Sequence, residues 1–259
     1  MVTIKTREEI EILKEGGKRL AFVLGEVSKK VRVGVSTQEL EDYARKLIED
    51  GGDKASFLGY TPRGAKRPYP AAMCVSVNDE IVHGIPNELS NGLAKILKEG
   101  DIVSLDLGVT HRGLITDSAL TLSLGKTSDE NRKLIEHCKE ALMRGIKSAR
   151  GGGHIGDIGY AIESFARPLG YGLSEGLCGH GVGYKVHEDP FVPNEGRKDT
   201  GELLCPGMVL ALEPMLTLGT DKVVLDQDGY TYKTADGSMA AHFEHSIVIT
   251  DGDPIILTK

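Results

Sequence analysis

The chain has 259 residues, 40% of them hydrophobic, and a formal net charge of −7. This is enough apolar material for a sizeable core in one or two domains, and the acidic balance argues against nucleic acid as the main partner. No apolar run is long enough to cross a bilayer and the first residues contain no apolar signal core, so we expect no membrane association.

Cysteine usage points to a reducing compartment. The chain has four cysteines and no Cys-x-x-Cys pair, which argues against a zinc ribbon and against a disulfide framework. We therefore predict a reduced, cytoplasmic protein. Nothing in the sequence indicates a self-association surface, so we expect a monomer.

The first elements along the chain are two helices. A long helix is expected over 7–29, and a second one follows a glycine turn within 31–48, where apolar residues recur at i, i+4, i+7 and i+8. Residues 149–166 repeat this second segment without a gap, and another long helix over 128–149 precedes them. We interpret the chain as two similar halves that each begin with a helix pair.

Each half then contains two strand-like runs that carry an acidic residue. The runs hold Asp106 and Asp117 in the first half, and Glu213 and Glu244 in the second. Two such halves packed face to face would bring the four acids together at the centre. We predict an α+β fold in which residues 1–259 form one domain with pseudo-two-fold symmetry, a curved antiparallel sheet inside and helices outside.

The acids of the first half are expected to share a hairpin. They are spaced as Asp-x10-Asp, and the segment between them contains the turn sequence Thr-His-Arg-Gly. Paired antiparallel strands would set Asp106 and Asp117 side by side on one face. Taken alone, the spacing fits two unrelated acids near a hairpin equally well. The matching acids of the second half favour a shared site.

Carboxylates in core strands require a cationic partner, because an unpaired buried charge is costly. Two divalent metal ions would balance the four acids. His180 would add an imidazole from Cys-Gly-His-Gly-Val-Gly, where glycines permit close backbone approach. Hard oxygen ligands with one nitrogen favour Mn(II), Fe(II) or Co(II) and are also compatible with Zn(II). Such a metal pair acidifies a water and polarises a carbonyl, so the sequence predicts a hydrolase.

Two further histidines are candidates for contact with substrate. His187, in Val-His-Glu-Asp-Pro, would donate to a carbonyl oxygen or a developing oxyanion. His83, after the strand-like run Glu-Ile-Val, would donate to substrate or relay a proton. Strand alternation does not place His187 on the face of His180 unless the glycines between them bend the chain. The alternative interpretation is a surface histidine before a turn for His187 and a solvent-facing histidine at a strand end for His83.

Several motifs along the chain form a specific combination. They are Glu-Ile-Val-His-Gly-Ile-Pro at 80–86, Gly-Asp-Ile-Val-Ser-Leu-Asp at 100–106, Cys-Gly-His-Gly-Val-Gly at 178–183, His-Glu-Asp-Pro at 187–190, Pro-Gly-Met at 206–208, Leu-Glu-Pro-Met at 212–215 and Glu-His-Ser-Ile-Val at 244–248. Together they resemble the type I methionine aminopeptidases, metallopeptidases of the pita-bread fold, over nearly the whole chain.

The resemblance implies a role for each candidate. The five acidic and histidine residues proposed above as ligands would hold a dinuclear site, with Asp117 and Glu244 bridging both metals. Glu213 would also be the general base. His83 would contact the scissile amide nitrogen, and His187 would stabilise the carbonyl oxygen as it becomes tetrahedral.

The resemblance also places Tyr60, Tyr69 and Cys74 in the methionine pocket. Two pocket positions differ from the family's usual pattern. Val186 stands where a large aromatic residue often precedes the second histidine, and Tyr230 replaces Trp in an Asp-Gly-Trp turn. These differences concern the size of the pocket rather than the metal ligands.

The segment 61–73, which contains Arg63, is longer and more basic than is usual in the family. Its basic part, residues 61–68, is a candidate ribosome contact, although a solvated surface loop is the simpler interpretation.

The implied activity is removal of the initiator methionine from the N-termini of nascent polypeptides whose second residue is small. One alternative is an Xaa-Pro aminopeptidase or prolidase-like enzyme that uses the same metals. The His-Gly-Ile-Pro strand, and the absence of a further domain before the first helix, favour the methionine branch. A second alternative is a non-enzymatic peptide-binding relative, which the complete set of metal ligands argues against.

Overall fold

The computed structural model describes residues 2–62, 64–86 and 94–259. The helices are α1 (Arg7–Ser28), α2 (Thr37–Asp50), α3 (Asp129–Ser148), α4 (Ile155–Ala166) and the short 3₁₀ helix η1 (Arg167–Leu169). The strands are β1 (Lys54–Ala55), β2 (Met73–Val77), β3 (Glu80–Val82), β4 (Ile102–His111), β5 (Leu114–Ser123), β6 (Gly172–Leu173), β7 (Cys178–Gly181), β8 (Glu188–Pro193), β9 (Val209–Leu212), β10 (Met215–Thr217), β11 (Val223–Leu225), β12 (Tyr232–Thr234), β13 (Ala240–His242), β14 (Glu244–Val248) and β15 (Ile255–Ile256).

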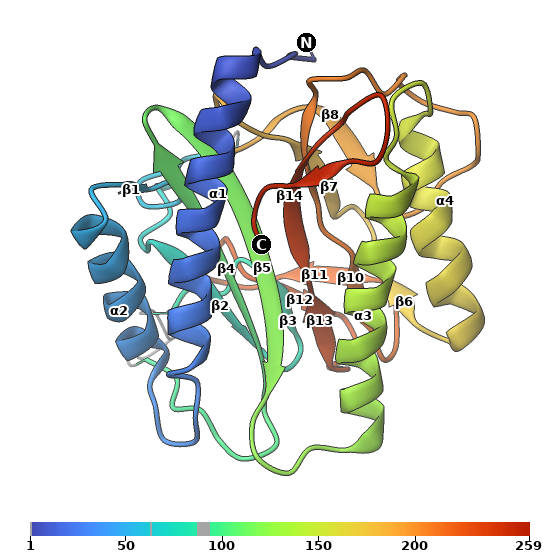
Figure 1. The fold of residues 1–259 in the computed structure, drawn as a ribbon. Helices are drawn as coiled ribbons and strands as arrows, with labels where there is room; N and C mark the ends of the chain where they lie inside the picture. Colours follow the sequence, from blue (N-terminus) through green and yellow to red (C-terminus); the bar gives the residue numbers. More distant parts are fainter. Residues whose placement is uncertain (1, 63, 87–93) are drawn as a thin grey trace.

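The four long helices form two pairs that cover one side of the central sheet, with α1 and α2 over one half and α3 and α4 over the other (Figure 1). Local chemistry explains where the first pair begins. The side chains of Thr6 and Ser36 each accept a hydrogen bond from the backbone amide of a glutamate three residues later. The carboxylate of each glutamate in turn accepts a hydrogen bond from the backbone amide of the capping residue. The predicted helix pairs are therefore present, with ends shifted by a few residues at most.

The central sheet runs in the order β1-β4-β5-β14-β9-β7-β8, with β2 beside β4 and β15 beside β14. β4 and β5 form the predicted hairpin, paired from Ile102 with Ser123 to His111 with Leu114. Its two-residue turn, Arg112-Gly113, has positive φ at both positions (48° and 87°), as a tight hairpin turn requires. A smaller sheet, β11-β12-β3, lies on the side of the central sheet away from the helices.

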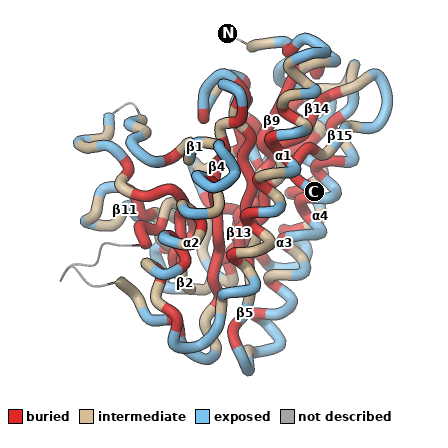
Figure 2. The backbone as a smooth tube through the Cα atoms, turned by 60° about the vertical axis from the view of Figure 1, so that its left-hand side comes forward, coloured by how far each residue is buried: buried red, intermediate tan, exposed pale blue. Residues whose placement is uncertain are grey.

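Each half of the molecule has its own hydrophobic core. In the first half, α1 and α2 pack on β2 and β4, while in the second, α3 and α4 pack on β9, β10 and β14. Buried residues line the strands and the sheet-facing sides of the helices (Figure 2). This arrangement matches the predicted fold, with a sheet inside and helices outside. None of the helices in the described part of the chain is long and apolar enough to cross a membrane.

Helix α1 lies so close to the C-terminal residues that a glycine is required at the contact. A Cβ at Gly17 would lie 2.3 Å from the carbonyl oxygen of Leu257, whereas a Cβ at Gly25 on the same helix would meet nothing within 4 Å. We expect Gly17→Ala to lower the free energy of unfolding by about 2–3 kcal/mol through overpacking. Gly25→Ala should raise it by up to about 1 kcal/mol through helix propensity. Urea unfolding of both variants tests this, and equal effects would contradict the close approach.

Candidate active site

The first half of the chain presents two carboxyl groups to one face of the central sheet. Asp106 lies on β4 opposite Ala119, and Asp117 lies on β5 opposite Gly108. Because side chains alternate along a strand, both carboxyls point to the same side and are diagonal neighbours across the hairpin. The expected hairpin is present, with this diagonal offset.

The second half of the chain contributes three more predicted ligands on neighbouring strands of the same sheet. Glu244 begins β14 opposite Ala119 of β5, Glu213 follows directly after β9, and His180 lies on β7 opposite Ala211 of β9. Five consecutive strands, β4, β5, β14, β9 and β7, therefore carry one predicted ligand each, at or next to the strand. Residues far apart in sequence meet because the sheet places these strands side by side.

Three of the four carboxyl groups on these strands are buried and incompletely hydrogen-bonded, and the fourth, that of Glu213, is partly exposed. Asp106, Asp117 and Glu244 each have one buried carboxylate oxygen without a hydrogen-bond partner in the described structure. Burial raises the pKa of all four carboxyls, that of Asp117 to about 7. Repulsion from the neighbouring acids raises the pKa of the other three further. The protein alone therefore neutralises this cluster by keeping protons on it.

The donor set fits divalent metal ions. Donor atoms of Asp117, His180 and Glu244 all lie within 4.8 Å of one another. His180 Nδ1 is 2.9 Å from the carbonyl oxygen of Gly181, to which it donates, so Nε2 carries no proton. That Nε2 lies 3.3 Å from Glu213 Oε1. A bare imidazole nitrogen beside carboxylate oxygens that lack partners is an arrangement that a cation stabilises.

The cluster lies in a cavity of about 350 Å³. All the sequence-predicted pocket residues line it: Tyr60, Tyr69, Cys74, Val186 and Tyr230. The rings of Tyr69 and Tyr230 pack edge to face with centroids 5.2 Å apart. The Cys74 thiol is buried and its pKa is raised well above the usual range, so it packs as an apolar group rather than a nucleophile.

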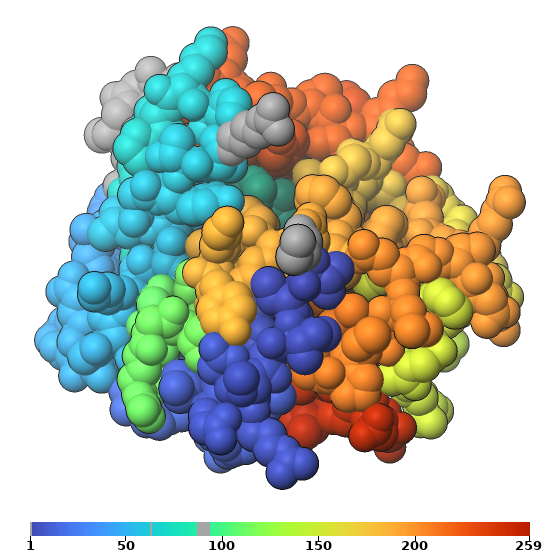
Figure 3. All heavy atoms as spheres, turned by 90° about the horizontal axis from the view of Figure 1, so that it is seen from above, coloured from blue at the N-terminus to red at the C-terminus, as the bar shows by residue number. Residues whose placement is uncertain are grey.

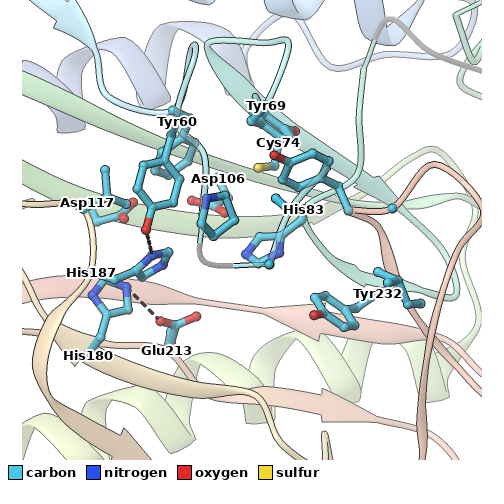
Figure 4. Close-up of a pocket in the computed structure, with 18 of the residues that line it drawn as sticks. Tyr60, Tyr69, Cys74, His83, Asp106, Asp117, His180, His187, Glu213 and Tyr232 are labelled. Carbon is cyan, nitrogen blue, oxygen red and sulfur yellow. Dashed lines mark hydrogen bonds and ion pairs between the residues drawn. The ribbon is translucent and has the colours of Figure 1, made fainter. Parts of the chain in front are cut away.

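His83 enters the cavity from the end of β3 (Figure 4). Its backbone has φ 60°, a left-handed conformation uncommon for a residue other than glycine. The following Gly84 is required because a Cβ there would lie 2.4 Å from the carbonyl oxygen of Val75. Burial lowers the pKa of His83 to about 4, so its imidazole is neutral at pH 7.

His187 reaches the same cavity by a bend in the chain. The backbone turns between the end of β7 and the start of β8, which brings the His187 ring to 4.4 Å from that of His180. The bend left open in the sequence interpretation is therefore present. The Tyr60 hydroxyl lies 2.8 Å from His187 Nδ1, as Figure 4 shows. Partial burial lowers the pKa of His187 and favours its neutral form.

Sequence reasoning missed several residues of the site. His242 is buried with its Nε2 3.6 Å from Glu213 Oε2, on the opposite carboxylate oxygen from His180. Its spacing of two residues before Glu244 was the available signal. Phe57 and Tyr232 also line the cavity, and no motif marked them.

The described part of the basic segment 61–73 closes one wall of the cavity. Arg67 donates to the carbonyl oxygen of Asp228 over 3.1 Å, and the Tyr230 hydroxyl donates to the carbonyl oxygen of Arg67. Lys66 is exposed, and Arg63 lies outside the described residues. Part of this segment therefore holds Tyr230 in the pocket.

A row of ligand-type residues under an apolar cavity is typical of a metallopeptidase, and comparison with known proteins agrees. The model of metallopeptidase family M24 matches residues 11–251. The chain belongs to this family.

Its full-length relatives are methionine aminopeptidases. The protein of that name from Aquifex aeolicus is 47% identical over 100% of this chain and 99% of its own. Methionine aminopeptidase 1 of Bacillus subtilis is 39% identical over 100% of both chains. A crystal structure of methionine aminopeptidase from Thermotoga maritima superimposes with a TM-score of 0.93 at 40% identity, covering 100% of each chain. The family resemblance inferred from the motifs is confirmed.

The structure of prolidase from Pyrococcus horikoshii shares the fold at lower similarity. Its TM-score is 0.73 at 22% identity, and the match covers 99% of this chain but 63% of the prolidase. This likeness concerns the fold alone.

The protonated cluster makes the stability of the metal-free protein depend on pH. The four carboxyls have folded-state pKa values above those of the unfolded chain, so their contribution to stability is complete below about pH 4 and is lost as pH rises through their folded pKa, about 7 for Asp117. We expect metal-free protein to lose up to about 1.4 kcal/mol per pH unit for each carboxyl that ionises above pH 5. Asp117→Asn should flatten this slope in thermal unfolding measured from pH 5 to 8.

Added Mn(II) or Co(II) should reverse the loss. An ion present at a hundred times its Kd stabilises the folded state by about 2.7 kcal/mol. The rise in Tm should be larger at pH 8 than at pH 5.5, because protons compete for the ligands. A rise equal at both pH values, or equal in Asp117→Asn, would contradict metal binding at this cluster.

Proposed function

We propose that the chain removes the N-terminal methionine from polypeptides whose second residue is small, as a metal-dependent methionine aminopeptidase. The observation that carries the proposal is a pocket with apolar walls built around three buried carboxyl groups, the partly exposed Glu213 and one buried imidazole. Full-length similarity to methionine aminopeptidases supports the same activity.

The residues that would hold two divalent ions are Asp106, Asp117, His180, Glu213 and Glu244. When bound, such ions acidify a water and polarise the scissile carbonyl. The ligand chemistry suits Mn(II), Fe(II), Co(II) or Zn(II). A free amine terminus fits this acidic end of the pocket, which agrees with an exopeptidase.

Glu213 is the proposed general base. Its side chain is 12% exposed, so it is reachable from the cavity. One of its carboxylate oxygens faces His180 and the other faces His242. From this position the carboxylate accepts a proton from the attacking water and delivers it toward the leaving amine.

His187 is the proposed donor to the substrate carbonyl oxygen. The Tyr60 hydroxyl, 2.8 Å from Nδ1, serves as donor to that nitrogen and leaves the ring proton on Nε2. The neutral ring then presents an N–H to the oxygen that gains charge in the transition state. His83, neutral and fixed by its left-handed backbone, is the proposed contact for the scissile amide nitrogen.

The walls of the pocket support the choice of substrate. Tyr60, Tyr69, Cys74, Val186 and Tyr230 enclose an apolar volume suited to an unbranched thioether side chain. A residue held at the floor of such a cavity leaves little room for the one that follows it, so a small second residue is favoured. We further propose that the protein acts as a monomer in the cytoplasm, on the N-termini of nascent chains.

The proposed specificity predicts which peptides are cleaved. Protein freed of metal and reloaded with Mn(II) or Co(II) should release methionine from Met-Gly and Met-Ala peptides. Met-Leu and Ala-Pro peptides should remain at least about a hundredfold less reactive, a difference of about 2.7 kcal/mol in transition-state binding. Peptide mass spectrometry provides the measurement. Cleavage of Ala-Pro with the Met peptides intact would instead assign an Xaa-Pro peptidase.

If Tyr60 fixes the ring proton of His187 on Nε2, removing the Tyr60 hydroxyl should lower kcat more than removing the Tyr232 hydroxyl. Tyr60→Phe should lower kcat about tenfold, because the ring proton of His187 is then no longer fixed on Nε2. His187→Ala should lower kcat about 10²–10³-fold. Tyr232→Phe removes a hydroxyl from the same cavity without breaking a hydrogen bond found in the described structure, so it is the matched control. Equal rates for Tyr60→Phe and Tyr232→Phe would overturn the role of Tyr60.

A further inference from the structure

A buried lysine outside the cavity lies behind the loop that carries His187. Lys5 precedes α1, and its ammonium is 2.7 Å from the Glu188 carboxylate, with side-chain exposures of 0% and 5%. Burying both charges is unfavourable unless geometry and hydrogen bonding are good, so this pair differs from the exposed ion pairs of the helices. The roles proposed above use neither residue.

The Glu188 carboxylate organises the loop around itself. It accepts hydrogen bonds from the backbone amides of Tyr184 and Lys185, at the start of the loop, and from the Thr3 hydroxyl over 2.6 Å. With the ammonium of Lys5, it has four donors, two from the loop and two from the N-terminal segment. The side chains of Val186 and His187, between these anchor points, line the cavity.

The N-terminal segment is itself fixed to the sheet. The backbone amide of Lys5 donates to the carbonyl oxygen of Gly207 over 2.8 Å. The Lys5 side chain passes across Gly183, where a Cβ would lie 2.5 Å from Lys5 Cε, and its ammonium lies 4.6 Å from the centre of the Tyr184 ring. Seen from above in Figure 3, the N-terminal segment (blue) packs against the gold segment that contains this loop.

On its outer side the loop also contacts α1, where the Tyr184 hydroxyl donates to Glu9 over 2.8 Å. Tyr184 is 45% exposed, and a second cavity of about 340 Å³ is lined by Thr3, Tyr184, Lys185, Glu188 and neighbouring residues. His187 lines both this cavity and the candidate active site. The loop therefore has space to move away from the substrate once the ion pair is lost.

From this arrangement we propose that Lys5 and Glu188 are positioning residues that hold His187 toward the substrate, which makes the N-terminal segment part of the support of the active site. The inference rests on the proposed role of His187. Lys5, at the start of the chain, would thereby affect the catalytic step in which His187, 182 positions later, contacts the substrate. A misplacement of about 1 Å at such a donor lowers turnover by about a hundredfold.

The test is a double-mutant cycle between Lys5→Met and His187→Ala in the metal-loaded enzyme. Lys5→Met should lower kcat for a Met-Ala peptide 10–100-fold with KM changed less than threefold, and it should have no further effect on kcat in the His187→Ala background. Lys14→Met, the same substitution in an exposed pair with Glu11 on α1, is the control and should leave kcat unchanged. Equal loss of kcat from Lys5→Met in both backgrounds would overturn the proposal.

Two further variants separate positioning from general stability. Lys5→Met/Glu188→Gln leaves no unpaired buried charge, so its Tm should recover toward that of the wild type while kcat stays at least tenfold low. Thr3→Val removes one donor to Glu188 without changing a charge and should lower kcat three- to tenfold even if Lys5→Met fails to fold. Recovery of kcat together with Tm in the double variant would reduce the pair to a structural role.

Amide hydrogen exchange tests the loop independently of turnover. The amides of Tyr184 and Lys185 should exchange at least tenfold faster in Lys5→Met, with the amides of α1 unchanged. If the wild type cleaves no methionyl peptide, the proposed function fails, whereas the exchange result still decides whether Lys5 holds the loop. Unchanged exchange at both amides would contradict the inference.

Discussion

Four carboxyl groups gathered on one face of a sheet, three of them buried and the fourth partly exposed, set the condition that the rest of the molecule must meet. Each would be costly to ionise there alone, and together they repel one another. Without a cation the protein keeps them protonated, as the raised pKa values of Asp106, Asp117, Glu213 and Glu244 indicate. In the proposed function, divalent ions bound at the same place would replace those protons and convert an unfavourable cluster into a site for hydrolysis.

The strands of the central sheet and the loops around it contribute different parts of the site. Five consecutive strands carry the ligand-type residues, and the two helix pairs behind them fix the sheet. Loops and strand ends supply His83, His187 and the pocket walls, so the walls can vary while the ligand row stays the same. The Val186 and Tyr230 differences from the family pattern fall in this variable part.

Local and periodic signals account for what the sequence predicted. Capping residues and apolar periodicity marked the helices, the turn sequence marked the hairpin, and acids within apolar runs marked the ligand row. The internal repeat then indicated that both halves contribute to one site. These features depend on residues close together in the chain, or on charged residues that are too costly to bury without a compensating partner.

Contacts between distant segments left no such signal. The Tyr60 hydroxyl meets His187 across a separation of 127 residues, and Lys5 meets Glu188 across 183. Lys5 stands in a polar stretch before a helix, where a lysine is ordinarily exposed, and only the packing of the first segment on the β7–β8 loop buries it. The left-handed backbone of His83 likewise had no signal in the motif around it.

The central claim is that divalent ions replace protons on the buried carboxyl cluster. Calorimetric titration of metal-free protein with Mn(II) at pH 7, in two buffers of different ionisation enthalpy, gives the number of ions bound and the number of protons released. The account predicts two ions per chain and a net release of protons. Folded protein that binds no ion, or binds ions at pH 7 without releasing protons, would contradict it.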